Sequence, residues 1–143
     1  MATEQITVQT TVNASLHETW HYYTESEHVI NWNFASEDWH CPAAVNDLRV
    51  GGDFRITMAA KDGSMSFDLE GTYDEVSPET HIAYTLSNGR KVSVDFSEGE
   101  GEGTGVVIDF DPEPGEDRDV QKQGWQSILD NFRQYAEAQS KGS

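Results

Sequence analysis

The segment "RDVQKQGWQSILDNFRQYAEAQ" (Arg118–Gln139) decides the fold of this chain. Its apolar residues recur at spacings of three and four, which predicts one long amphipathic helix whose apolar stripe contains Val120, Trp125, Ile128, Leu129, Phe132 and Ala136. Asp117 is placed to cap the start of this helix. Gly124 costs the helix about 1 kcal/mol relative to alanine, and its position beside Trp125 predicts that a sheet approaches closely there.

The residues before this helix predict the sheet that covers it. Ile6–Val12 alternates as a first strand, and Ser15 with Glu18 forms a capping box for a helix over Leu16–Thr24. Ser26 begins a second, shorter helix, and "NFASEDWHCPAAV" (Asn33–Val45) has no clean period and is expected to be an ordered connection. From Asp47 to Phe110 the period is two, interrupted by the turn pairs Asp62-Gly63 and Asn88-Gly89. The order is one strand, two short helices, six strands in consecutive hairpins and the long helix.

The stretch "DLRVGGDFRI" (Asp47–Ile56) interrupts this alternation with two adjacent glycines, Gly51 and Gly52. No helix follows them, so they do not form a phosphate-binding loop. A sheet that wraps around a helix needs places where its strands bend, and glycine relieves side-chain crowding at such places. We expect Gly51-Gly52, and Gly71 in the following strand, to bend the sheet.

Composition limits the classes of function. The length of 143 residues predicts a single domain over residues 1–143 with an ordered core from about residue 5 to residue 138. The net charge is −17. So acidic a protein is repelled by nucleic acids and anionic membranes, and neither is expected as a partner. No apolar run could cross a bilayer and the N-terminus lacks a secretory pattern, so the expected location is the cytoplasm. The protein is expected to be a monomer or a weak dimer. Cys41, the only cysteine, is expected to be a buried apolar group.

Four segments in this order resemble the START-like, helix-grip superfamily, also called the SRPBCC proteins. They are "SLHETWHYYTESEHVINW" (15–32), "DLRVGGDFR" (47–55), "KDGSMSFDLEGTYDEVSP" (61–78) and "GWQSILDNFRQYAE" (124–137). Within that superfamily they are most similar to bacterial domains related to the C-terminal domain of the activator of the heat-shock-protein-ninety ATPase. The stretch "WNFASEDWHCP" (32–42) further resembles a polyketide-cyclase-like subgroup. The resemblance implies an α+β fold of Bet v-like type, in which a curved antiparallel sheet grips the C-terminal helix around a hydrophobic cavity.

Large side chains are candidates for the wall of that cavity. The aromatic residues and two methionines are more than a small core needs, and rings of this size leave gaps when they pack. The predicted ligand-binding residues are Trp32, Phe34, Trp39, Phe54, Met58, Met65, Phe67, Tyr84, Trp125 and Leu129. The alternative is that these residues simply fill the core. Trp39 and Trp125 are the foremost candidates for contact with a ligand.

No metal site, cofactor or catalytic residue is predicted. His17 and His21 are four apart on a helix, but no third ligand follows them, so a solvated helix surface is the preferred interpretation. His40 and Cys41 are adjacent on an extended segment and point apart, and His81 has no evident partner. The chain contains no nucleophile elbow, dinucleotide fingerprint or phosphate-binding loop.

Three functions are therefore compared. The first is binding of a small hydrophobic molecule, such as a lipid, a polyketide or a flavonoid-like compound. The second is a cochaperone that stimulates a heat-shock ATPase, a role in the stress response that the family name implies. The third is a cyclase-like or hydrolytic enzyme, whose only candidate polar groups are Tyr73, Tyr84, Asp38 and His40. The first is preferred, and the protein is expected not to be an enzyme.

Overall fold

A computed structural model of the chain describes residues 5–33, 38–87, 89–98, 103–112 and 115–141. Residues 140 and 141 are described without their side chains. Seven strands and three helices follow one another along the described part of the chain. Their order is β1 (Ile6–Val12), α1 (Leu16–Thr24), α2 (Ser26–Val29), β2 (Trp39–Asn46), β3 (Asp53–Ala60), β4 (Ser66–Ser77), β5 (His81–Leu86), β6 (Lys91–Glu98), β7 (Thr104–Phe110) and α3 (Arg118–Lys141).

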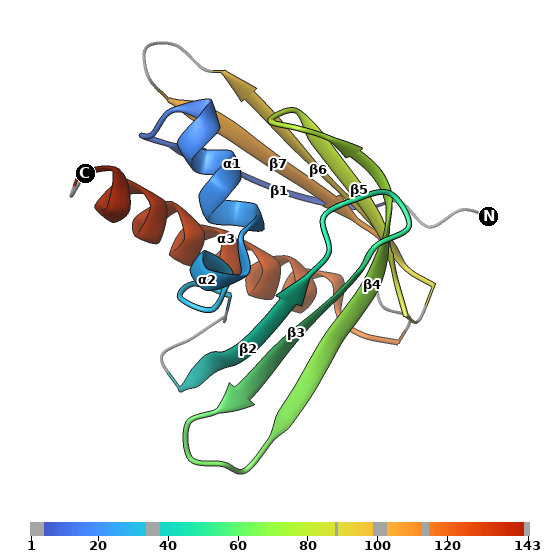
Figure 1. Cartoon of the computed structure of the whole chain (residues 1–143). Helices are drawn as coiled ribbons and strands as arrows, with labels where there is room; N and C mark the ends of the chain where they lie inside the picture. Colours follow the sequence, from blue (N-terminus) through green and yellow to red (C-terminus); the bar gives the residue numbers. More distant parts are fainter. Residues whose placement is uncertain (1–4, 34–37, 88, 99–102, 113–114, 142–143) are drawn as a thin grey trace.

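The strands form one antiparallel sheet in the order β1-β7-β6-β5-β4-β3-β2. Strands β2 to β7 pair with their neighbours in sequence, and β1 closes the far edge against β7, with Ile6 opposite Phe110. Figure 1 shows the sheet curling into a half-barrel, with α3 along its concave side and α1 and α2 beside α3. The expected α+β helix-grip architecture is confirmed.

The core lies between α3 and the concave face of the sheet. In β7, Val106, Ile108 and Phe110 are buried and the residues between them are more exposed, because alternate side chains of a strand point to opposite faces. The ring of Phe110 stacks on that of Trp125, with centroids 4.1 Å apart. Further along α3, Leu129, Phe132 and Ala136 are fully buried. Their spacing of three and four places them on the face that meets the sheet.

The caps of the helices are as predicted. The Ser15 hydroxyl accepts a hydrogen bond from the Glu18 backbone N–H at 3.1 Å at the start of α1. The Asp117 carboxylate accepts hydrogen bonds from the backbone N–H groups of Asp119 and Val120 at the start of α3. Val120 is 63% exposed, so the apolar stripe of α3 meets the core later than predicted: Trp125 is partly buried and Leu129 is the first fully buried residue.

The interpretation of Gly51 and Gly52 as a sheet-bending pair is wrong. Both lie in the turn between β2 and β3, where Gly51 has a φ of 85°. A Cβ atom on Gly52 would lie 2.1 Å from the backbone oxygen of Asp47, so the turn closes only without a side chain there. Gly124 also differs from the prediction, since a Cβ atom there would meet nothing within 4 Å.

The segment expected to be an irregular connection contains the edge strand β2. Its alternation is hidden in the sequence by Pro42 and by a register shift between His40 and Ala43. Proline and bulges are tolerated on an edge strand because one side of it needs no ladder hydrogen bonds. A sequence pattern broken in this way is typical of an edge, and β2 is the edge that borders the candidate site.

Candidate ligand-binding cavity

A cavity of about 220 Å³ lies between the concave face of the sheet and α3. Its sheet wall is formed by alternate residues of β3, β4 and β5, among them Phe54, Ile56, Met58, Leu69, Tyr73 and Tyr84. Trp125, Ile128 and Leu129 line it from α3. The junction of α1 and α2 supplies the remaining side through residues that include Tyr23 and Val29. The wall is thus mostly aromatic and aliphatic.

A glycine in β4 makes room for one of the wall's aromatic rings. A Cβ atom on Gly71 would lie 2.7 Å from Cε1 of Phe54 and 2.8 Å from the backbone oxygen of Thr85. The Phe54 ring therefore lies directly over Gly71, where it also meets Tyr84 edge to face at a centroid distance of 4.8 Å. Gly71 thus serves the cavity by close approach of a ring.

The structure brings seven of the ten predicted residues to the cavity wall. These are Trp32, Phe54, Met58, Phe67, Tyr84, Trp125 and Leu129. Trp39 and Met65 are not part of the wall. Trp39 packs against Phe67 with ring centroids 5.8 Å apart, and Met65 is 63% exposed at the end of the β3–β4 hairpin. Phe34 lies outside the described residues.

Three tyrosines give the cavity polar groups. Burial raises the pKa of the hydroxyls of Tyr23, Tyr73 and Tyr84, and the nearby tyrosines raise those of Tyr23 and Tyr84 further. The guanidinium of Arg90 opposes this shift at Tyr84. All three hydroxyls are therefore neutral hydrogen-bond donors at physiological pH, and none is suited to act as a base.

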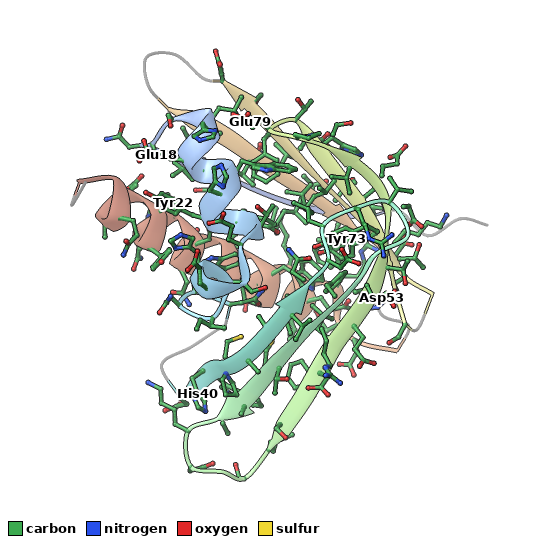
Figure 2. All side chains as sticks on the ribbon, viewed as in Figure 1. Glu18, Tyr22, His40, Asp53, Tyr73 and Glu79 are labelled. Atoms are coloured by element: carbon green, nitrogen blue, oxygen red, sulfur yellow. The ribbon has the colours of Figure 1, made fainter. Side chains whose placement is uncertain are left out.

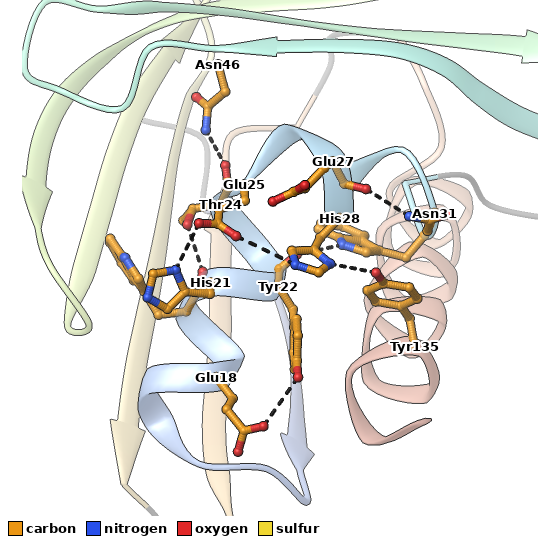
Figure 3. A network of polar contacts seen from close by, with 12 residues as sticks. Glu18, His21, Tyr22, Thr24, Glu25, Glu27, His28, Asn31, Asn46 and Tyr135 are labelled. Carbon is orange, nitrogen blue, oxygen red and sulfur yellow. Dashed lines mark hydrogen bonds and ion pairs between the residues drawn. The ribbon is translucent and has the colours of Figure 1, made fainter. Parts of the chain in front are cut away.

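Hydrogen bonds hold the helical side of the cavity to the sheet and to α3. The Tyr73 hydroxyl donates to the side-chain oxygen of Asn46 at 2.5 Å, and the Asn46 amide donates to the backbone oxygen of Thr24 at the end of α1. On the other side, His28 of α2 is joined to the Tyr135 hydroxyl of α3 at 2.6 Å. Figure 3 shows the Asn46–Thr24 contact on one side of the α1–α2 junction and the His28–Tyr135 contact on the other. The junction is therefore fixed between β2 and α3.

Of the four candidate catalytic groups, Tyr73 and Tyr84 share the cavity wall, whereas Asp38 and His40 lie apart from them. Asp38 and His40 are exposed, and Figure 2 shows His40 at the far end of β2, away from Tyr73. Cys41 is buried as expected, and burial raises the pKa of its thiol. Among the described residues that line the cavity there is no carboxylate, imidazole or thiol. The wall supplies hydrogen-bond donors and a cation, but no general base.

The histidines outside the cavity form ion-pair contacts on the surface. His17 and His21 lie side by side with ring centroids 4.4 Å apart, and each faces a carboxylate, Glu79 and Glu25 respectively. The expectation that His81 lacks a partner is wrong. Its two ring nitrogens lie 2.6 Å from Asp95 and 3.0 Å from Glu75, which come from neighbouring strands.

The most informative residue that sequence reasoning missed is Arg90. It is the only charged residue among those described that line the cavity. A signal for it exists in the sequence, because Arg90 continues the inward-facing row of Val92, Val94 and Phe96 at a period of two. Its place directly after Asn88-Gly89 instead predicts a residue of the turn.

Comparison with known proteins assigns the family. The family model described as "Activator of Hsp90 ATPase homolog 1-like protein" matches residues 13–137. The chain belongs to this AHSA1-like family. The family assignment and the fold together confirm the resemblance to the START-like, or SRPBCC, superfamily.

Solved structures agree with this assignment. The AHSA1-like chain is 38% identical to an AHSA1-like protein from Aeromonas hydrophila, with a TM-score of 0.84 and 94% of each chain covered. It is 47% identical to a protein from Cytophaga hutchinsonii, with a TM-score of 0.80 and coverage of 97% of this chain and 96% of the other. A protein from Chromobacterium violaceum, at 16% identity and a TM-score of 0.82 over 94% of this chain and 97% of the other, shares the fold. No curated protein matched the sequence.

Proposed function

We propose that this AHSA1-like protein binds a small, largely apolar molecule in the cavity between the sheet and α3. The observation that carries the proposal is the cavity itself, about 220 Å³ in volume and lined mainly by aromatic and aliphatic side chains. Apolar cavities of about 150 Å³ bind a molecule as small as benzene. The volume here suits a ligand of one or two rings, or a short to medium acyl chain.

The shape of the fold supports this assignment. Clefts between a curved sheet and a helix are concave and largely preformed, and a few polar groups in an apolar wall orient a ligand. In this cavity those polar groups include the tyrosine hydroxyls, Asn46 and Arg90. Part of the wall is open to solvent, since Phe67 is 50% exposed and Val45 is 58% exposed. These two residues mark the side from which a ligand enters.

Two neutral probes, phenylbutyramide and the two-ring compound coumarin, test the proposal by thermal unfolding. A probe at a hundred times its Kd raises the free energy of unfolding by about 2.7 kcal/mol, which increases Tm by several degrees. We expect at least one of the two to increase Tm and to change the tryptophan emission, because Trp32 and Trp125 line the cavity.

A matched pair of variants locates the binding. Ala44 lines the cavity, and Ala43, the preceding residue of β2, is exposed. Ala44→Leu fills part of the cavity and is expected to abolish the Tm increase, whereas Ala43→Leu retains it. Probes that leave Tm unchanged at saturation, or that act equally on both variants, would contradict the proposal.

Stimulation of a heat-shock ATPase is the alternative that the family description suggests. No contact or surface among the described residues adds to that description. An ATPase assay with micromolar protein tests it, and stimulation unaffected by Ala44→Leu would assign the activity to the outer surface.

A further inference from the structure

We infer that the ligand of this cavity carries an acid group on an apolar body, and that Arg90 binds the acid. This inference rests on the proposed function and adds the chemistry of the ligand. The acid is a carboxylate or a group of similar charge and shape, and the apolar body occupies the aromatic wall.

The β5–β6 hairpin places Arg90 on the inner face of the sheet. Its backbone oxygen accepts a hydrogen bond from the backbone N–H of Leu86 at 2.8 Å, which aligns Arg90 with the end of β5. From there Val92 and Val94 continue the same face of β6 and are buried. Lys91, the next residue, belongs to the opposite face and is exposed. The hairpin therefore directs one cation inward and its neighbour outward.

The charge of the wall is opposite to that of the rest of the molecule. The protein has a net charge of −17, yet the single charge among the described cavity residues is the positive charge of Arg90. The attraction between opposite charges is stronger in surroundings of low polarity than at the surface. Arg90 therefore attracts an acid group on the ligand and repels an amine.

Other polar groups of the cavity wall also suit an acid. The hydroxyls of Tyr23 and Tyr84 stay protonated, because burial raises their pKa, so they are available as donors. A guanidinium has five N–H donors, so it can keep a contact within the protein and still bind a carboxylate with two parallel hydrogen bonds.

Three probes of one shape separate charge from apolar fit: phenylbutyrate, phenylbutyramide and phenylbutylamine. Isothermal titration calorimetry near neutral pH is expected to give a Kd for the acid about tenfold or more below that of the amide, as for a charge-assisted hydrogen bond. The amine is expected to bind more weakly than the amide. The overall negative charge of the protein favours the amine, so the opposite order must come from a local cation.

Variants of the hairpin assign the effect to one residue. Arg90→Gln is expected to lower the affinity for the acid about tenfold and to leave that for the amide within about threefold. Lys91→Gln removes the same charge one residue away and is expected to keep the preference for the acid. Arg90→Lys keeps the charge without the planar fork and is expected to retain part of the preference.

The possible outcomes separate the inference from the proposed function. If acid and amide bind equally to the unaltered protein, the inference fails and the proposed function stands. If neither binds at millimolar concentration, both fail. If Arg90→Gln and Lys91→Gln reduce acid binding equally, the preference belongs to net charge, and the role of Arg90 is wrong. The comparison of acid with amide in the unaltered protein does not depend on the folding of any variant.

Discussion

The contact between Gly71 and Phe54 shows how single residues shape the cavity. The Phe54 ring occupies the space that a side chain on residue 71 would need. It is held there by the rings of Tyr73 and Tyr84 at centroid distances of 5.3 Å and 4.8 Å. The position of this ring in the wall therefore depends on residue 71 being glycine, which has no Cβ atom.

Gly71→Ala is expected to lower the free energy of unfolding by about 1–3 kcal/mol, because the new methyl group meets both a ring and a backbone oxygen. Urea unfolding followed by tryptophan fluorescence measures the change. Glu70→Ala, on the exposed face of the same strand, is the control and is expected to change stability by no more than about 0.5 kcal/mol. A Gly71→Ala protein as stable as the unaltered one would show that the ring moves aside freely.

His81 makes the stability of the folded protein depend on pH. Partial burial lowers its pKa, but hydrogen bonds to Asp95 and Glu75 and the charges of these carboxylates outweigh this and raise it. The raised pKa in the folded state stabilises the protein fully below the unfolded value of about 6.5, and this contribution is lost as the pH rises through the folded pKa.

His81→Gln is therefore expected to lower Tm more at about pH 5.5 than at about pH 8.5, where less of this contribution remains. Thermal unfolding of both proteins at the two pH values gives this difference directly. Asp95→Asn removes the nearer carboxylate and is expected, like His81→Gln, to lower Tm more at about pH 5.5 than at about pH 8.5. An equal effect of His81→Gln at both pH values would contradict the assignment.

At the scale of elements, α3 carries an avoidable cost at Gly124. Glycine within a helix is less favourable than alanine by about 1 kcal/mol, and a Cβ atom at this position meets nothing within 4 Å. The close approach of a sheet that the sequence suggested does not occur. Packing therefore does not require glycine at position 124.

Gly124→Ala is expected to raise the free energy of unfolding by about 0.5–1 kcal/mol. Urea unfolding measures it, and Gln123→Ala, exposed on the same turn, is the control with an expected change of only a few tenths of a kcal/mol. Destabilisation by Gly124→Ala would mean that the backbone or a neighbour needs the space. Phenylbutyramide affinity measured on the same variant would show whether this space belongs to the cavity entrance.

The whole molecule is dominated by its charge, with 26 acidic and 9 basic residues. Repulsion between like charges destabilises the compact state, and at 0.1 M salt it is largely screened between charges more than about 10 Å apart.

None of the described helices is long and apolar enough to span a membrane.

Tm is therefore expected to rise by a few degrees when NaCl is increased from about 20 mM to about 500 mM. Differential scanning calorimetry measures the rise, and KCl at equal concentration is expected to give the same rise, since screening does not distinguish the two cations. A Tm that falls with salt, or that responds to only one of the two salts, would contradict this account.

Periodicity alone was enough to predict most of the elements. The stripe of α3 and the alternation of β3 to β7 depend only on which side chains avoid water, and the caps at Ser15 and Asp117 depend on local hydrogen bonds. Strand β2 was missed because Pro42 and a bulge broke its pattern. Gly51 and Gly52 were misplaced because glycine suits a turn and a bend equally well.

The amino-acid sequence by itself determined the order of elements in the helix-grip architecture and placed seven of the ten predicted residues in the cavity wall, because both follow from repeating apolar patterns along single elements. Only the tertiary structure decided which rings share one wall, that Trp39 is not part of it, and that Arg90 faces inward beside Tyr84. These facts depend on how far each strand extends past α3 and on how the sheet curls. Such distances arise from the packing of several elements at once, and no local pattern encodes them.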